Sequence, residues 1–233
     1  MRPGLVTDTC NCLDCIRKSP IFRFLSDEQL IRFNENRYET KYNAGEIIFK
    51  QGTAMTHMMS FTSGLAKIYL EGSNQRNIIL RIIKAGEFIG GPGMFTDFRH
   101  HFTVRAIEDS SACFIDVNVF KDIMNENTEF SIQTYKSANM HTLKNFQKFV
   151  SLTQKQMPGR IADAIIYLYE EIYQSNPFQI TLSRQELGDM TALSKESAIR
   201  ILKQFKDEKI ISINQNELEI LNEDALYEIS RIG

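Results

Sequence analysis

The chain has 233 residues, which is enough for one large domain or two smaller ones. Hydrophobic residues make up 42% and charged residues 24%, as in ordinary globular proteins, and the apolar runs are too short for a membrane helix. The net charge of −2 gives no global basic excess of the kind that favours nucleic-acid binding. Because the N-terminus lacks an apolar leader, we expect a cytoplasmic protein with reduced thiols and no membrane association.

Three of the four cysteines fall within seven residues near the N-terminus. Cys10, Cys12 and Cys15 lie in the sequence TCNCLDC, within a tail expected over residues 1–20, and Cys113 lies far along the chain. Because a disulfide framework is not expected in a reducing compartment, these thiols indicate metal ligation, redox chemistry or no role at all.

Residues 40–120 are rich in β-forming residues, with glycine at short intervals. The segments EIIFK, AKIYLE, NIILRII and ACFIDV predict short strands, and the sequences NAGE, EGSNQ and KAGE predict turns between them. Many short strands interrupted by glycine are typical of a sandwich or barrel-like β-domain, which we place at residues 21–123.

A long helix is expected after the β-domain, at residues 124–156. Neither glycine nor proline occurs between Val119 and Met157, and one stripe of side chains recurs every three or four residues. The stripe consists of Ile132, Tyr135, Asn139, Leu143, Phe146 and Val150. Part of it is expected to pack on the chain's own β-domain and the remainder to pair with a second copy as a coiled coil. Plain core packing is the alternative for any single residue of the stripe. Pro158 and Gly159 are expected to end the helix and to mark a domain boundary.

The segment SRQELGDMTALSKESAIRILKQFKDEKII, residues 183–211, predicts two helices joined by a tight connection. Ser183 and Glu186 form a capping box for a short helix, and Ser194 caps the second one. The second helix has a buried stripe at Ala198, Ile201, Leu202 and Phe205, and an exposed face at Lys195, Glu196, Ile199, Arg200, Lys203 and Lys206. This is the pattern of a helix-turn-helix, and the following ISINQNELEIL predicts the two strands of a wing.

Positive charge is concentrated on the second of these helices. From Ser194 to Lys209 there are five basic and three acidic residues, whereas the whole C-terminal domain expected at residues 158–233 has 8 basic and 13 acidic residues. A solvated amphipathic helix also carries such charges. The preceding helix, the turn and the caps favour double-stranded DNA as the partner of this face.

On these motifs the chain resembles the Crp/Fnr family of bacterial transcription regulators over nearly its whole length. Residues 43–95, NAGEIIFKQG…GLAKIYLEG…AGEFIGGPGMF, are similar to the family's cyclic-nucleotide-binding-type β-roll, a double-stranded jelly roll. The long helix is similar to its dimerisation helix, and residues 183–205 are similar to its helix-turn-helix. The resemblance implies an α+β fold with a winged DNA-binding domain, a homodimer on a palindromic site, RNA polymerase as a partner and no enzymatic activity.

The resemblance also implies which residues contact DNA. Glu196 matches a glutamate that accepts from a cytosine amino group, and Arg200 matches an arginine that contacts guanine O6 and N7, so a half-site containing TGA is expected. Ile199 stands where relatives carry a small or hydroxylated residue, and it either touches a thymine methyl or relaxes readout. Ala192 replaces the usual turn glycine at a cost of about 1 kcal/mol. The expected DNA contacts are Ser183, Arg184, Ser194, Lys195, Glu196, Ile199, Arg200 and Lys203.

The β-roll departs from the relatives that bind cyclic AMP. Those relatives have a glutamate for the ribose after the GEFIG turn and an Arg-Ser pair for the phosphate, whereas this chain has Gly91 and His101-Phe102 there. We therefore expect an effector other than cyclic AMP. Arg99 or Arg105 would bind a different anion, although a lone arginine is more often a surface residue. The candidate effector pocket consists of Gly90, Gly91, Arg99, His101 and Phe102.

In the oxygen-sensing branch of the family, an N-terminal cysteine cluster and a cysteine at the end of the β-roll hold a [4Fe–4S] cluster. Cys113 matches the distant ligand, and Cys10, Cys12 and Cys15 would supply the others, although their spacing is tighter than is usual in the family. A four-cysteine zinc site, a redox-sensitive thiol set, bound haem and no role remain open. The candidate haem ligands are His57, His100, His101 and the many methionines, and no spacing singles out one of them.

Two other classes of protein compete with a DNA-binding regulator. A β-roll signalling module that binds a small ligand or haem without a DNA role leaves residues 183–209 unexplained. A redox enzyme built on the tail thiols lacks a glycine-rich phosphate loop and a thiol with an adjacent base. We therefore expect a dimeric regulator in which a redox, gas or small-molecule signal at the β-roll re-aims the helix-turn-helix pair.

Overall fold

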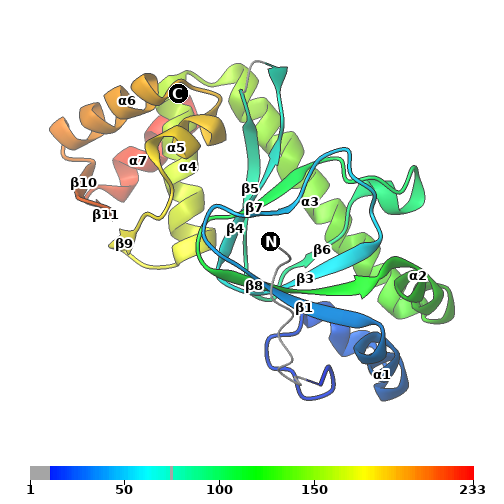
Figure 1. Cartoon of the computed structure of the whole chain (residues 1–233). Coiled ribbons are helices and arrows are strands. Elements are labelled where there is room, and N and C mark those ends of the chain that lie inside the picture. Colours follow the sequence, from blue (N-terminus) through cyan, green and yellow to red (C-terminus); the bar gives the residue numbers. More distant parts are fainter. Residues whose placement is uncertain (1–10, 74–75) are drawn as a thin grey trace. The chain divides into compact units, whose positions relative to one another are not determined.

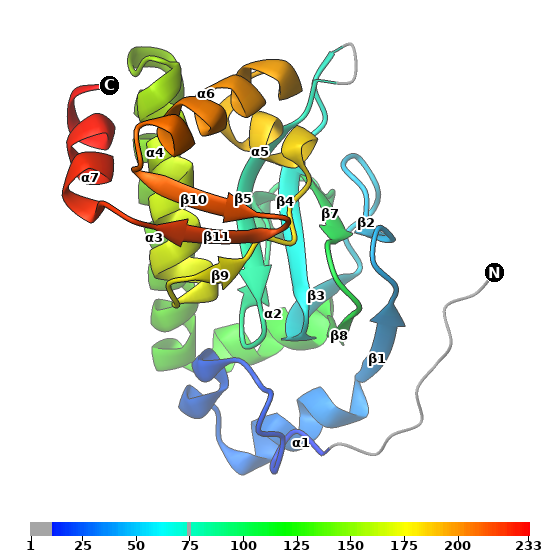
Figure 2. The same cartoon turned by 90° about the vertical axis from the view of Figure 1, so that its left-hand side faces the viewer.

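The computed structural model describes residues 11–73 and 76–233, and Figures 1 and 2 show its helices and strands. These residues fall into two compact units. The first unit contains residues 11–70 and 82–143, and the second contains the described residues of 71–81 together with 144–233. The domain boundary predicted between residues 156 and 158 falls inside the second unit. Among the described residues, none of the helices has the length and apolar character that crossing a bilayer requires.

Two four-stranded sheets form the β-roll. One has the order β1-β8-β3-β6, with β1 at Arg37–Tyr42, β8 at Ser110–Asp116, β3 at His57–Ser63 and β6 at Phe88–Ile89. The other has the order β2-β7-β4-β5, with β2 at Ile47–Phe49, β7 at Thr103–Ala106, β4 at Leu65–Leu70 and β5 at Ile78–Lys84. The strands predicted from EIIFK, AKIYLE, NIILRII and ACFIDV are confirmed as β2, β4, β5 and β8.

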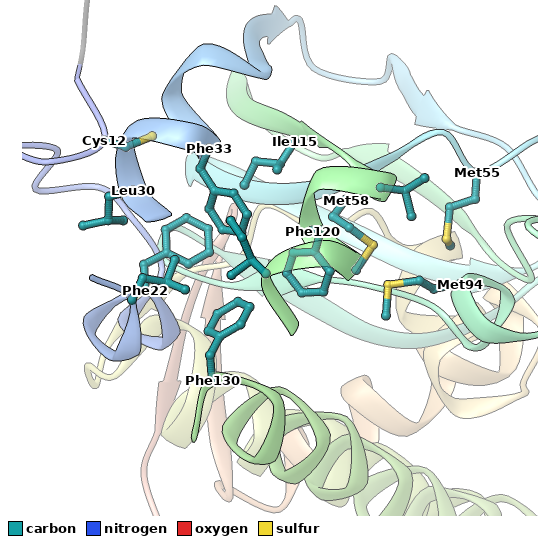
Figure 3. Close-up of a cluster of buried hydrophobic side chains, with 13 residues drawn as sticks. Cys12, Phe22, Leu30, Phe33, Met55, Met58, Met94, Ile115, Phe120 and Phe130 are labelled. Atoms are coloured by element: carbon teal, nitrogen blue, oxygen red, sulfur yellow. The ribbon is translucent and has the colours of Figure 1, made fainter. Parts of the chain in front are cut away.

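An aromatic core joins the β-roll to the helices around it. The helices are η1 at Pro20–Phe24, α1 at Asp27–Glu35 and α2 at Val117–Glu126. The ring of Phe33 from α1 stacks on that of Phe120 from α2, with centroids 6.0 Å apart, and meets the ring of Phe22 edge-on at 5.5 Å (Figure 3). Cys12 belongs to the same buried cluster, so the N-terminal segment is part of this core.

The long helix α3 runs from Thr128 to Gln154 and has 27 residues. It begins later than the predicted residue 124, because the chain leaves α2 at Asn127, whose side-chain oxygen accepts from the backbone N–H of Phe130 at 2.9 Å. Phe130 is the buried residue of the helix. The predicted stripe at Ile132, Tyr135, Asn139, Leu143, Phe146 and Val150 is exposed in the single chain.

The second unit is a helical domain with a small sheet. Helix α4 at Met157–Tyr167 continues into a π-helix at Leu168–Tyr173, and strand β9 at Phe178–Gln179 pairs with β11. Pro158 lies in the first turn of α4, where a proline is well tolerated, so it opens this helix. The other elements are α5 at Arg184–Thr191, α6 at Lys195–Asp207, β10 at Ile211–Asn214, β11 at Glu217–Ile220 and α7 at Glu223–Ile232.

Candidate DNA-reading surface and thiol pocket

Helix α5 is fixed by the capping box predicted from its sequence. The Oγ of Ser183 accepts from the backbone N–H of Glu186 at 3.2 Å, and the backbone N–H of Ser183 donates to the Glu186 carboxylate at 2.7 Å. Two backbone donors that have no partner inside the helix are thereby satisfied. The capped end leaves Ser183 exposed and Arg184 half-buried.

The turn between α5 and α6 depends on a glycine that sequence reasoning missed. Ala192 ends α5 in the left-handed conformation, at φ 53° and ψ 38°. The backbone N–H of Leu193 then donates to the carbonyl of Gly188 at 2.9 Å. A Cβ at position 188 would lie 2.8 Å from the Leu193 carbonyl oxygen, so the close approach needs glycine inside α5. The isolated glycine in a helical pattern was the available signal.

Helix α6 has one buried face and one exposed face. The Oγ of Ser194 accepts from the backbone N–H of Ser197 at 3.1 Å and caps the helix. The buried face consists of Ala198, Ile201, Leu202 and Phe205. The exposed residues include Lys195, Glu196, Ile199, Arg200, Lys203 and Lys206. The predicted reading face therefore points to solvent.

The charged groups of this face are held loosely. A guanidinium nitrogen of Arg200 lies 3.8 Å from the sulfur of Met157, which is a weak acceptor that leaves the other N–H groups of Arg200 available. The amine of Lys206 donates to the carbonyl of Ile213 at 3.3 Å and so joins α6 to the first wing strand. The wing hairpin turns at Gln215, which has φ 54°.

A second candidate site is a pocket in the first unit, lined in part by three of the four cysteines. Cys12 and Cys15 reach it from the N-terminal segment, and Cys113 reaches it from strand β8. Arg37 and Glu39 of β1 also line the pocket. We name it the thiol pocket. Cys10, the fourth predicted ligand, lies outside the described residues.

Specific hydrogen bonds hold the N-terminal segment at the thiol pocket. The amine of Lys18 donates to the carbonyls of Cys12 and Leu13 at 3.1 and 2.7 Å. The side-chain oxygen of Asn34 accepts from the backbone N–H of Cys12 at 3.1 Å and from Nε of Arg37 at 3.3 Å. The segment is thus tied to α1 and β1, although sequence reasoning treated residues 1–20 as a tail.

The electrostatics of the thiol pocket are set by burial and by one guanidinium. Nη1 of Arg37 lies 3.4 Å from Sγ of Cys113. Burial raises the pKa of the Cys113 thiol to about 12, and the positive charge of Arg37 opposes this shift. Burial also raises the pKa of the Cys12 thiol, and the positive charge of Arg37 again opposes this shift. The ion pair of Arg17 and Glu39, at 3.5 Å, lies at the same pocket.

The donors of the thiol pocket suit a thiophilic metal or cluster in their chemistry, since thiolates are the ligands of zinc and iron–sulfur sites. Within residues 11–73 and 76–233, however, no three His, Cys, Asp or Glu side chains stand in positions that would hold a metal ion. The described cysteines thus line a common pocket without forming a preassembled site.

The candidate effector pocket is occupied by the chain's own side chains. A Cβ at Gly90 would lie 2.6 Å from Cε of Met58, and one at Gly91 would lie 3.0 Å from Cε of Met55 and 3.6 Å from the Phe102 ring. Met55 and Met58 are buried. Little space is therefore left beside the two glycines.

The charged residues predicted for the effector pocket have other partners. The guanidinium of Arg99 donates to the carbonyl of Gly52 at 2.7 Å, and His101 pairs with Asp97 at 3.0 Å. The guanidinium of Arg105 donates to the carbonyl of Gly45 at 2.6 Å.

The histidines considered as haem ligands lie in separate surroundings. His57 meets Tyr38 edge-on at 5.0 Å between ring centroids, and buried His100 stacks on Phe49 at 3.9 Å. Burial lowers the pKa of both imidazoles, that of His100 to about 4. His101 is exposed and pairs with Asp97. The three rings thus have different neighbours.

Comparison with known families covers both units of the chain. Residues 39–127 match the cyclic nucleotide-binding domain, and residues 159–229 match the Crp-like helix-turn-helix domain. The chain belongs to the Crp/Fnr family of transcription regulators. The predicted fold class, with a jelly-roll domain, a long helix and a C-terminal helix-turn-helix, is confirmed.

Two relatives by sequence and one by structure show how similar the chain is to other members of the Crp/Fnr family. The fumarate and nitrate reduction regulatory protein of Vibrio cholerae is 22% identical over 229 residues, covering 96% of this chain and 91% of that protein. The cAMP-activated global transcriptional regulator CRP of Salmonella typhimurium is 23% identical over 191 residues, covering 80% and 91%. FixK2 of Bradyrhizobium japonicum has the same fold, with a TM-score of 0.76 at 16% identity over 83% of this chain and 96% of its own. As a Crp/Fnr-type protein, the chain is a DNA-binding transcription regulator.

Proposed function

We propose that the chain acts in the cytoplasm as a homodimer that reads a palindromic DNA site with TGA-containing half-sites through α6. One observation carries the proposal: Glu196 and Arg200 are exposed on a helix whose opposite face is buried in its own domain. The major groove offers a cytosine amino donor to a carboxylate, and guanine O6 and N7 to a guanidinium. Ser183, Arg184, Ser194, Lys195 and Lys203 would contact phosphates and fix the register of the helix.

The exposed stripe of α3 supports the homodimer. Tyr135 is 72% exposed, Phe146 63% and Phe149 69%, and aromatic side chains at this spacing leave a large apolar surface in water. Two such helices would cover it as a coiled coil, and a two-fold axis suits a palindrome. We expect wild-type protein to sediment as a dimer and Phe146→Glu to sediment as a monomer. A wild-type monomer at micromolar concentration would contradict this part of the proposal.

A DNA-binding assay tests the reading of the palindrome. Labelled duplexes would carry TGA and its complement TCA as inverted half-sites, with a scrambled duplex of equal length and composition as the control. Specific proteins bind their sites typically 10³-fold or more tighter than other DNA. We expect a clear preference for the palindrome that survives raised salt, and equal binding of both duplexes would contradict the proposal.

We further propose that the signal reaches the β-roll through the thiol pocket and is not cyclic AMP. Met55 lies against Gly91, which stands where the nucleotide-binding relatives have a ribose acceptor, and Met58 lies against Gly90. The guanidinium of Arg99 donates a hydrogen bond to the Gly52 carbonyl. Cyclic AMP at millimolar concentration should therefore leave DNA affinity unchanged. A cyclic AMP-dependent rise in affinity would contradict this part of the proposal.

For the thiol pocket we propose a [4Fe–4S] cluster held by Cys10, Cys12, Cys15 and Cys113, with zinc as the alternative occupant. When bound, the cluster would supply sensitivity to oxygen. The residues of the chain supply the thiols, the positive charge of Arg37 and the ties from Lys18 and Asn34 that bring the N-terminal segment to the β-roll.

Anaerobic purification tests the occupant of the thiol pocket. The absorbance spectrum is recorded together with iron, sulfide and zinc content, for wild type and Cys113→Ser. A brown protein with iron and sulfide that Cys113→Ser lacks supports the cluster, and colourless protein with one zinc supports the alternative. Colourless, metal-free wild-type protein would overturn both. RNA polymerase is the expected partner, as its recruitment is how such a dimer would act on transcription.

A further inference from the structure

Ile199 is an exposed apolar side chain on the polar face of α6. It is 43% exposed, and the other large apolar residues of α6, Ile201, Leu202 and Phe205, are buried. At about 100° of rotation per residue, Ile199 lies one turn beyond Lys195 and Glu196 and one turn before Lys203. It therefore stands on the exposed arc near its border with the buried stripe, with Lys195 on one side and Lys203 and Glu196 on the other.

Arg200 lies farther round the helix than Ile199. As the next residue it is rotated by about 100°, toward the side where its guanidinium approaches the sulfur of Met157. Glu196 and Arg200 therefore lie on the same side of Ile199, and Ile199 occupies the neighbouring part of the exposed face. A β-branched side chain on a helix is held largely in one χ1 rotamer, so the Cγ2 methyl group of Ile199 occupies a largely fixed position on this face.

The chemistry of the major groove offers one apolar partner to such a side chain. Base edges in this groove present hydrogen-bond donors and acceptors, except for the C5-methyl group of thymine. An isoleucine pressed against a donor or acceptor would remove it from water without a replacement hydrogen bond, which is unfavourable. Against a thymine methyl, the same side chain buries apolar surface on both partners.

We infer that Ile199 selects thymine by contact with its C5-methyl group, an inference that rests on the proposed function of α6. The half-site TGA contains two candidate thymines, the one in TGA and the one opposite its adenine. Glu196 and Arg200 read hydrogen-bonding groups, and Ile199 adds discrimination that depends on a methyl group.

The test replaces thymine by uracil, which removes the methyl group and leaves base pairing unchanged. Inverted-repeat TGA duplexes are made with thymine throughout, or with uracil at either candidate position or at both, symmetrically in the two half-sites. Dissociation constants are measured by fluorescence anisotropy for full-length wild type, Ile199→Val, Ile199→Ala and Arg200→Ala. Circular dichroism verifies that each variant is folded.

The loss of one buried methyl corresponds to about fourfold in affinity per half-site, so the symmetric duplex should bind roughly 15-fold more weakly. Ile199→Val should retain most of this difference, and Ile199→Ala should bind thymine and uracil duplexes equally. Arg200→Ala should weaken binding of both duplexes while keeping their ratio, because it removes a different contact. Such a cycle isolates the contact from any effect of uracil on the DNA itself.

Either of two results would overturn this inference and leave the proposed function intact. The first is that wild-type protein binds the thymine and uracil duplexes equally while still preferring the palindrome over scrambled DNA. The second is that Ile199→Ala keeps the full preference for thymine. Failure of wild type to prefer the palindrome at all would instead overturn the proposed function, and this inference with it.

Discussion

Arg37 and Cys113 are joined by a hydrogen bond, with Nη1 3.4 Å from Sγ. The two residues lie on the neighbouring strands β1 and β8, where Arg37 stands opposite Ile115, so Cys113 is its diagonal neighbour. A guanidinium at this distance favours the thiolate, and thiolates are what soft metal ions bind.

Replacing Arg37 should weaken the metal binding that we propose for the thiol pocket. We expect Arg37→Gln to lower the affinity of the reduced protein for cadmium about tenfold, because the thiolates lose a nearby positive charge. The thiolate–cadmium absorbance in titrations measures this. Arg23→Gln is the matched control, since Arg23 lies over the ring of Phe24. Equal affinities for both variants and wild type would show that Arg37 has no such role.

In the α5–α6 turn, substitutions of two small residues should change the free energy of unfolding in opposite directions. Ala192 is at φ 53°, where glycine is preferred, so Ala192→Gly should raise the free energy of unfolding by about 1 kcal/mol. Gly188→Ala should lower it by about 1–3 kcal/mol, because the new Cβ would lie 2.8 Å from the Leu193 carbonyl oxygen. Urea unfolding measures both. Destabilisation by Ala192→Gly would contradict the assigned backbone geometry.

His100 should make stability depend on pH. Burial lowers the pKa of its imidazole from 6.5 to about 4. Between these values the unfolded chain binds a proton that the folded chain does not, so the free energy of unfolding decreases as the pH falls through this window. The pKa of His57 is also lowered, so the informative comparison is between wild type and His100→Phe.

In His100→Phe, the new phenyl ring should still stack on Phe49. In wild type the ring centroids of Phe49 and His100 lie 3.9 Å apart. Melting temperatures measured between about pH 7 and pH 4 should fall less steeply for this variant than for wild type. Parallel curves would mean that His100 does not contribute to the pH dependence.

Asp163 connects three helices of the second unit. Its carboxylate accepts from the Oγ of Ser151 in α3 at 2.5 Å, from the amine of Lys155 at 2.8 Å and from the Oγ of Ser230 in α7 at 2.5 Å. Asp163→Asn should lower the free energy of unfolding by about 1–3 kcal/mol, because partly buried donors to a charged group are left poorly satisfied.

An exposed ion pair provides the control for Asp163. Glu171 pairs with Lys144, and their side chains are 44% and 49% exposed, so Glu171→Gln should cost no more than about 1 kcal/mol. Hydrogen exchange should also increase at the ends of α3 and α7 in Asp163→Asn. Equal, small losses in the two variants would show that Asp163 is not a structural centre.

Local signals in the sequence predicted the parts of the fold that depend on neighbouring residues. The capping box of Ser183 and Glu186 and the buried and exposed faces of α6 could be predicted, since each follows from residues within one or two helical turns. The start of α3 was wrong by a few residues, because Asn127 satisfies backbone groups at a break that carries no glycine or proline.

Features that depend on distant contacts could not be predicted from local patterns. The N-terminal segment reaches the thiol pocket through a hydrogen bond between Cys12 and Asn34, which are 22 residues apart. Strand β3, which is buried along most of its length, was not predicted, because HMMSFTS has no strict alternation.

The central claim is that the exposed face of α6 reads bases. Its most direct test is the ratio of affinities for the TGA palindrome and for a scrambled duplex, measured by anisotropy for wild type, Glu196→Ala and Arg200→Ala. Glu219→Ala and Arg231→Ala are charge-matched controls on β11 and α7. Each α6 variant should lose about 1–3 kcal/mol of discrimination per half-site, and the controls should keep the wild-type ratio. An unchanged ratio in both α6 variants would contradict the account.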